Sequence, residues 1–478
     1  MAEHTVEKIG GTSMSDFSAV RDNIILGNRT ENEIYNRIFV VSAYSGVTDR
    51  LLEHKRTGDA GVYALFSHSD SDWAWGDELT RLSKFLCEIN EELFGDELLS
   101  QQADQFIAER IEGVRNCLLD LQRLCSYGHF QLEDHLLTVR EMLAGIGEAH
   151  SAFNTTLLLQ NAGYNARLVD LTGWRDSETL PLDEKISQAF EKLDLSRELA
   201  IVTGYTQCQE GLMRTFDRGY SEMTFSRIAC MTEALEAIIH KEYHLSSADP
   251  KIVDQEKVVP LGRTNYDVAD QLANLGMEAI HPRAAKGMRQ ADIPLRLKNT
   301  FEPEHTGTLI TRDYVSEKPQ VEIVAGKKHV FGIEVFDQDM LGEPGADRRF
   351  LEVLARFKVH FISKDTNANT ITHYVDATLR TIKRVVKALE ESFPSAEIST
   401  RKVAIVSAIG SDMQVPGLLA TAVNALHEEE IGVLAMHQCM RQVDLQFVVE
   451  ESDFERAIST LHGRLIEPHK HEYAIVAA

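Results

Sequence analysis

The chain has 478 residues, of which 43% are hydrophobic, and a formal net charge of −25. This length suggests about two to four domains with an ample apolar core. Because binding to phosphate backbones needs clustered lysine and arginine, so acidic a chain is not expected to bind nucleic acid.

The first elements alternate between strand and helix. Residues 6–9 form an expected strand that Gly10 and Gly11 end, and an amphipathic helix led by Ser15 follows. A second strand, at residues 38–41, runs into the loop SAYSGVTD and a further helix. Strand, glycine loop and helix in succession predict an open α/β sheet.

The middle of the chain is expected to be largely helical. Residues 77–144 show helical spacing with few glycines, and Gly147-Glu148 is interpreted as opening or interrupting a helix. Residues 165–173 and 198–205 are then predicted as two buried strands.

The rest of this domain returns to helices. A loop leads into a helix predicted over residues 225–240, and another helix has Gly276 as its expected stop. A strand and its exit follow at residues 293–300. These elements complete a first domain, which we place at residues 1–311.

Beyond a polar stretch at residues 312–319, the sequence contains a diverged internal repeat. Two strands each end in an Asp-Met pair, Asp339-Met340 and Asp412-Met413, and after each pair the pattern is helix, two strands, helix. One irregular α+β domain is an alternative. The repeat favours two small ferredoxin-like α+β modules, at residues 320–398 and 399–478.

No metal site, disulfide framework or membrane span is expected. The six cysteines form no CxxC pair, and the 18 histidines include no HExxH motif. No apolar run reaches the length of about 18 residues that spans a membrane, and the N-terminus lacks a secretory signal. Reduced cysteines are typical of the cytoplasm, where we expect the protein to reside.

The glycines after the first strand belong to the sequence Lys8-Ile9-Gly10-Gly11-Thr12-Ser13. Glycines let backbone N–H groups approach an anion closely, and the lysine adds a full positive charge. At a strand exit before a helix, such a cluster suits a transferring phosphoryl group. It is not a Walker A loop, because GxxxxGK[ST] is absent. An ordinary glycine turn is the alternative.

A second polar cluster places Arg218-Gly219 before Ser221-Glu222 at a helix start. An arginine in this position can bind a carboxylate in bidentate fashion. However, serine is also a common N-cap, and the helix dipole alone favours a glutamate in the first turn. The residues by themselves therefore leave a purely structural role open.

In the order of its motifs the chain resembles the aspartokinases of the amino-acid kinase family. KIGGTS is similar to the family's opening KFGGTS, and TFDRGYSEMTFS to its segment TLGRGGSD. Further similar segments are VVSAYSGVTDRLL, GIGEAHSA, SSADPK, LGMEAIHPRA and IPLRLKNTFEPEHTGTLI, and the repeat resembles the family's paired ACT modules. The resemblance implies an α/β amino-acid-kinase open sandwich with a mostly parallel central sheet, followed by two ACT modules.

The resemblance also implies an activity, the phosphorylation of the side-chain carboxylate of L-aspartate by ATP, with Mg²⁺ on the phosphates. Lys8 would bind the transferring phosphoryl group, and Glu222 would orient Lys8. The implied substrate-binding residues are Ser42, Thr48, Glu148, Arg218 and Ser221. The implied phosphate- and ATP-binding residues are Lys8, Gly10, Gly11, Ser13, His240, Lys241, Ser246, Lys251 and Glu278.

Several positions depart from the family pattern. Asp217 and Tyr220 stand where the family has glycines, and Glu222 is one methylene longer than the family's aspartate. His240-Lys241 stands where the family has Thr-Asp, and Glu278 where it has lysine. A charge swap is one hypothesis, and drift in an inactive site is another. These segments resemble a divergent subgroup of aspartokinases linked to ectoine synthesis.

The resemblance implies a homodimer through the ACT modules and leaves a tetramer open. An effector amino acid would bind at the loop of residues 337–347, ahead of a helix, although the modules can also serve dimerisation alone. Two rival functions stay open. One is another amino-acid kinase, acting on glutamate or its acetyl derivative, and the other is a kinase-like amino-acid sensor without catalysis.

Overall fold

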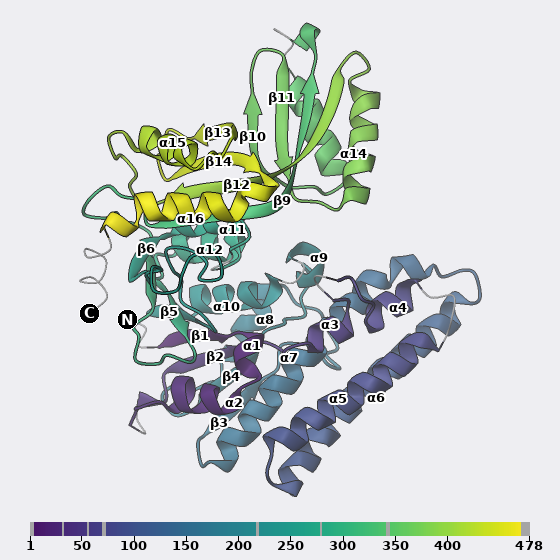
Figure 1. Ribbon diagram of the computed structural model, residues 1–478. Coiled ribbons are helices and arrows are strands. Elements are labelled where there is room, and N and C mark those ends of the chain that lie inside the picture. Colours follow the sequence, from purple (N-terminus) through teal and green to yellow (C-terminus); the bar gives the residue numbers. More distant parts are fainter. Residues whose placement is uncertain are drawn as a thin grey trace. The chain divides into compact units, whose positions relative to one another are not determined.

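The computed structural model of the chain describes residues 4–30, 33–54, 57–68, 73–216, 219–277, 280–340 and 345–469 (Figure 1). Two compact units make up the chain. The first comprises Met1–His244 and Ile280–Arg312, and the second Leu245–Ala279 and Asp313–Ala478. The domain limits expected from the sequence stay a prediction. Within the described ranges, no helix is long and apolar enough to cross a membrane.

The first unit contains a sheet with the strand order β3-β4-β2-β1-β5-β7-β8. Neighbouring strands run parallel, except for the antiparallel pair of β7 and β8. The strands are β1 (Thr5–Ile9), β2 (Arg37–Val41), β3 (Ala166–Val169), β4 (Leu199–Thr203), β5 (Glu236–Lys241), β7 (Leu295–Asn299) and β8 (Thr308–Thr311). The predicted α/β class with a mostly parallel sheet is thus confirmed, and the exit of β1 lies between those of β2 and β5.

Helices connect these strands. The long helices α5 and α6 lie side by side (Figure 1) and, with α7, confirm the helical prediction for residues 77–144. The helix expected from Ser15 has Asp16 as its N-cap, whose Oδ1 accepts a hydrogen bond from Ala19 N at 3.1 Å. The helices are α1 (Gly11–Met14), α2 (Phe17–Ala19), the π-helix η1 (Val20–Leu26), α3 (Val47–Leu51), α4 (Val62–His68), α5 (Ala74–Leu93), α6 (Glu97–Cys125), η3 (Leu132–Asp134), α7 (Leu136–Asn161), α8 (Leu182–Phe190), α9 (Leu212–Phe216), α10 (Tyr220–Met231) and α12 (Pro282–Gln290).

The helix predicted over residues 225–240 is wrong in its second half. Helix α10 ends at Met231, and Glu236–Lys241 forms the strand β5 between β1 and β7. Glu233 ends the helical run because it has a left-handed backbone with a φ of 54°. Beyond it, Ala237 and Ile239 are fully buried, so the apolar side chains follow the two-residue period of a strand.

Gly147 and Glu148 lie inside α7, so the prediction that they open or interrupt a helix is wrong. A Cβ atom on Gly147 would come within 2.6 Å of the Cβ atom of Ala43. Glycine is therefore needed here because the loop after β2 packs directly against the helix.

The second unit contains the predicted repeat, with the runs β9-α13-β10-β11-α14 and β12-α15-β13-β14-α16. Its sheet has the order β10-β11-β9-β12-β14-β13, and all neighbours are antiparallel. One apolar core surrounds Phe350 and a separate one surrounds Phe447. Two modules, rather than one irregular domain, therefore share a continuous sheet through β9 and β12.

The elements of the second unit agree closely with the expected pattern. They are β6 (Arg263–Asn265), α11 (Tyr266–Asn274), β9 (Ile323–Phe336), η5 (Gln338–Met340), α13 (Ala346–Arg356), β10 (Phe361–Thr366), β11 (Thr370–Val375), α14 (Leu379–Ser392), β12 (Glu397–Ile409), α15 (Leu418–Glu428), β13 (Val433–Gln438), β14 (Asp444–Glu450), η6 (Glu451–Asp453), α16 (Phe454–Leu465) and η7 (Glu467–His469).

Candidate active site

The glycines after β1 bring three loops together at the carboxyl edge of the sheet. Gly10 is the N-cap of α1 and donates a backbone hydrogen bond to His240 O at 3.2 Å. A Cβ atom on Gly11 would lie 2.7 Å from Ala43 O, in the loop after β2. Only glycine allows this approach, and the exits of β1, β2 and β5 meet where ligands of open α/β sheets bind.

Lys8 is the charged residue at this edge. Its side chain is buried, and its Nζ lies 3.9 Å from Glu222 Oε1. Burial lowers the pKa of Lys8 from its ordinary value, while the nearby carboxylate of Glu222 acts in the opposite direction. The structure thus brings together the two residues that the resemblance pairs.

Glu148 supplies a second carboxylate from α7. It is buried, its Oε1 accepts a hydrogen bond from the Tyr220 hydroxyl at 2.7 Å, and its Oε2 has no hydrogen-bond partner among the described residues. Burial raises the pKa of Glu148 to about 7, although the bond from Tyr220 favours the ionised form. Its free oxygen can accept a hydrogen bond from a cationic group of a ligand.

The exit of β4 completes this side of the site. A Cβ atom on Gly204 would lie 3.0 Å from the Cβ atom of Ser221 and 3.3 Å from Cγ of Glu148. The start of α10 and the middle of α7 therefore meet at Gly204, and Ser221 and Glu148 are close to one another.

The loop before α12 lies against the start of α10. His281 N donates a hydrogen bond to Glu222 Oε2 at 2.5 Å. A Cβ atom on Gly219 would touch the His281 ring at 2.6 Å. This contact was not predicted from the sequence. The segment Ile280-His281-Pro282 could have indicated it, because His281 caps a helix that begins with proline.

Ser42 and Thr48 flank the same edge in the loop after β2 and in α3. Ser42 O accepts a hydrogen bond from Ser151 Oγ at 2.9 Å, one turn along α7 from Glu148. Ser13, in contrast, uses its buried side chain in a hydrogen bond with Thr300 Oγ1 at 2.9 Å.

His240 points to the other face of the sheet, where it meets Glu7. His240 Nε2 and Glu7 Oε2 are 2.7 Å apart, and Arg37 Nε donates to Glu7 Oε1 at 2.6 Å. Burial lowers the pKa of His240; burial alone would raise the pKa of Glu7, but the arginine and the histidine hold it far below its usual range. His240 therefore belongs to a buried polar network within the sheet.

The remaining predicted nucleotide residues belong to different units or lie outside the described residues. Lys241 is half-buried, with its Nζ 5.8 Å from the centre of the Tyr243 ring. Ser246 and Lys251 belong to the second unit. Arg218 and Glu278 lie outside the described residues, as does the departing residue Asp217.

Among the residues that the structure describes, no group of three His, Cys, Asp or Glu side chains is placed to hold a metal ion.

Known proteins with similar sequences and structures are aspartokinases. The amino acid kinase family matches residues 3–299, and an ACT domain matches residues 396–463. Aspartate kinase Ask_Ect of Stutzerimonas stutzeri is 57% identical over 475 residues, which cover 99% of this chain and 100% of that protein.

Two solved structures share the fold. Aspartokinase III of E. coli, in complex with aspartate and ADP, has a TM-score of 0.72 and 20% identity over 97% of this chain and 100% of its own. The aspartate kinase of Clostridium acetobutylicum has a TM-score of 0.68 and 20% identity over 96% of this chain and 100% of its own.

Proposed function

The chain belongs to the aspartate kinases of the amino acid kinase family, and we propose that it transfers the γ-phosphoryl group of ATP to the side-chain carboxylate of L-aspartate. The observation that carries this proposal is the buried lysine–carboxylate cluster at the exits of β1 and β4. Lys8 faces Glu222, and Glu148 offers a free oxygen beside Ser221.

In this reaction the chain positions and neutralises charged groups. The nucleophile is a carboxylate that is already ionised at pH 7, so no general base is required. Lys8 would neutralise charge on the transferring phosphoryl group, and Glu222 would fix the direction of its ammonium. Glu148 Oε2 would accept a hydrogen bond from the substrate ammonium, and Arg218 would bind a substrate carboxylate.

ATP would lie along the second half of the kinase domain, beside Lys241 and the loop before His281. Mg²⁺ would be carried by the nucleotide phosphates, where it neutralises charge during transfer. Gly10, Gly11 and Ser13 would contribute donors on the phosphate side. The contact of His281 N with Glu222 supports this placement, because it joins the loop before α12 to the residue that faces Lys8.

We place this chain in the ectoine-linked subgroup of the aspartokinases. The relative Ask_Ect, whose name carries this association, is similar over its whole length. We therefore place the reaction at the first step of aspartate-derived biosynthesis, with ectoine as the candidate end product.

The second unit would dimerise and regulate. Leu434 and Met436 on the edge strand β13 are 39% and 51% exposed, which supports a homodimer through the sheets. An effector amino acid would bind near residues 337–347, of which residues 341–344 lie outside the described ranges.

Substrate-dependent release of ADP tests the proposed activity. We expect turnover with L-aspartate and at least about 100-fold less with L-glutamate, because a fixed pocket discriminates strongly when polar groups are displaced. Turnover with glutamate would favour another amino-acid kinase, and no turnover with either substrate would favour the sensor.

A further inference from the structure

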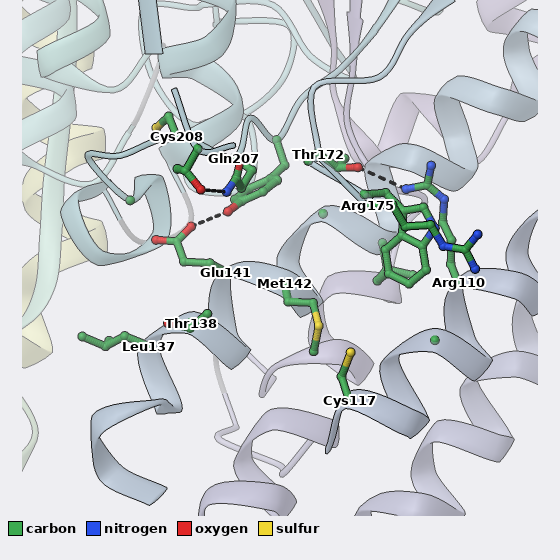
Figure 2. Close-up of a pocket in the computed structure, with 18 of the residues that line it drawn as sticks. Arg110, Cys117, Leu137, Thr138, Glu141, Met142, Thr172, Arg175, Gln207 and Cys208 are labelled. Carbon is green, nitrogen blue, oxygen red and sulfur yellow. Dashed lines mark hydrogen bonds between the residues drawn. The ribbon is translucent and has the colours of Figure 1, made fainter. Parts of the chain in front are cut away.

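A cavity of about 570 Å³ lies between α6, α7 and the loops that follow β3 and β4 (Figure 2). This volume is in the range of pockets that bind small molecules. None of the described candidate residues for aspartate or ATP lines it. It opens beyond the carboxyl ends of two parallel strands, where open α/β sheets commonly bind ligands.

One wall of the cavity is apolar and firmly held. The Trp174 ring packs against α6, where a Cβ atom on Gly113 would lie 2.5 Å from the ring. The guanidinium of Arg110 lies 5.3 Å from the centre of the same ring and forms an ion pair with Asp170. Met142 extends from α7 into the cavity (Figure 2) and adds a second apolar surface.

The other end of the cavity carries two opposite charges, Glu141 and Arg214, which form no ion pair within 4.0 Å. Glu141 accepts hydrogen bonds from the Tyr205 hydroxyl at 2.5 Å and from the backbone N of Arg214 at 3.0 Å. The guanidinium of Arg214 donates to Glu210 O at 3.1 Å, and within the described ranges no carboxylate lies within 4.0 Å of it.

Gly211 separates these two charged groups. Its φ is 67°, and a Cβ atom there would lie 3.0 Å from Glu141 Oε1 and 3.4 Å from Arg214 Nε. Gly211 therefore lies directly between the carboxylate and the guanidinium, and both of these groups line the cavity.

We propose that this cavity is a binding site for a free α-amino acid with an apolar side chain. Arg214 would bind the α-carboxylate, Glu141 would accept a hydrogen bond from the α-ammonium, and the side chain would pack on Trp174 and Met142. A zwitterion fits because both of its charges meet an opposite charge, while the rest of the lining is largely apolar.

A ligand at this site would act on the candidate aspartate site through two tyrosines. Tyr205 bonds to Glu141 and Tyr220 bonds to Glu148, which lies two turns further along α7. The two tyrosine rings meet edge to face with their centres 5.5 Å apart. A ligand that moves Glu141 would therefore shift Tyr220 and change the KM for aspartate, a consequence that rests on the proposed function.

Calorimetric titration of the full chain tests binding without any turnover. The probes are L-leucine, L-methionine and L-phenylalanine, and leucinamide and 4-methylpentanoate are analogues that lack the carboxylate or the ammonium. We expect at least one of the three amino acids to bind with a Kd below about 1 mM, and we expect leucinamide and 4-methylpentanoate to bind at least about ten-fold more weakly than that amino acid.

Variants locate the binding in the cavity. Arg214→Gln is expected to weaken binding of that amino acid at least about ten-fold. The control Arg197→Gln, at a side chain that is 83% exposed, should leave binding unchanged. Because Trp174 forms the wall, binding should also change the tryptophan fluorescence, and Trp174→Phe should remove that change.

Three results would overturn the proposal. The first is that none of the three amino acids binds, and the second is that the Arg214→Gln variant binds with the same affinity as the wild-type chain. The third is that L-aspartate displaces the bound amino acid, which would make the cavity part of the substrate site. Binding by a chain that shows no kinase activity would leave this proposal intact and would contradict only the proposed function.

Discussion

Tyr220 donates a hydrogen bond to Glu148 across 72 positions of the chain, with 2.7 Å between the hydroxyl oxygen and Oε1. Tyr220 is the first residue of α10, at a position where the resemblance to the aspartokinases implies a glycine. The bond occupies one oxygen of a buried carboxylate and leaves the other for a ligand. The altered loop is thus joined to the candidate substrate site.

Tyr220→Phe is expected to raise the KM for aspartate about three- to ten-fold with little change in kcat. The substitution keeps the ring against Tyr205 and removes a hydrogen bond to a charged group, which contributes about 1.5–3 kcal/mol at most. The exposed Tyr127→Phe is the matched control. The defect should be larger at pH 6.5 than at pH 8.5, because the lost bond favours ionised Glu148. An unchanged KM would show that the bond has no part in substrate binding.

The buried Glu148 should make stability fall as pH rises. Its pKa in the folded chain, about 7, exceeds its ordinary value of 4.5, so the folded state favours the neutral form. At a pH between 4.5 and 7, unfolding therefore releases a proton from Glu148. The stabilisation that neutral Glu148 gives to the fold is complete below pH 4.5 and is lost as the pH rises through about 7.

Glu148→Gln removes this ionisation and keeps an oxygen that can accept the bond from Tyr220. The wild-type chain should therefore lose up to about 3 kcal/mol relative to the variant between pH 4 and pH 8. Thermal unfolding of both chains across this range measures the difference. If the difference in stability between the two chains does not vary with pH, folding does not raise the pKa of Glu148.

Gly11→Ala is expected to lower the free energy of unfolding by about 1–3 kcal/mol and to reduce kinase turnover. The added Cβ atom would lie 2.7 Å from a backbone oxygen, that of Ala43, which cannot move alone. Gly95→Ala is the control, because nothing lies within 4 Å of a Cβ atom there. If both variants unfold at the same denaturant concentration, the two loops do not meet as the structure shows.

The sequence predicted most of the fold because its signals are local. The bounds of β14 and α16 follow directly from alternation and helical spacing. The strand β5 was missed because its two isoleucines continue an apolar pattern that also suits a helix. Only the left-handed turn at Glu233 and the place between β1 and β7 decide its state.

The candidate site was predictable only in part. Motif order identified Lys8, Glu148 and Glu222, and their proximity is a property of the fold. The bond of His240 to Glu7 depends on which face of β5 the side chain occupies, and no local pattern reveals this. The acceptor of the Tyr220 hydroxyl is equally remote in sequence.

Met436→Lys tests the association of the second unit. Met436 projects from the edge strand β13 with 51% of its surface exposed. A lysine there should weaken a homodimer through the sheets because it would bury an unpaired charge at the interface. Light scattering coupled to size-exclusion chromatography measures the mass. Lys402→Met, away from this edge, should leave the mass unchanged, and a stable dimer in Met436→Lys would place the interface elsewhere.

Lys8→Met is expected to lower kcat roughly 100- to 1,000-fold, because it removes the ammonium that would neutralise the transferring phosphoryl group. Methionine has a similar length, and burial already disfavours the charge of Lys8, so the melting temperature should not fall. Affinity for aspartate, measured by calorimetry, should change far less than kcat, which separates a catalytic role from a structural one. Lys84→Met, at a side chain that is 81% exposed, is the matched control. Turnover near the wild-type rate in Lys8→Met would contradict the assignment of the β1 exit as the phosphoryl site.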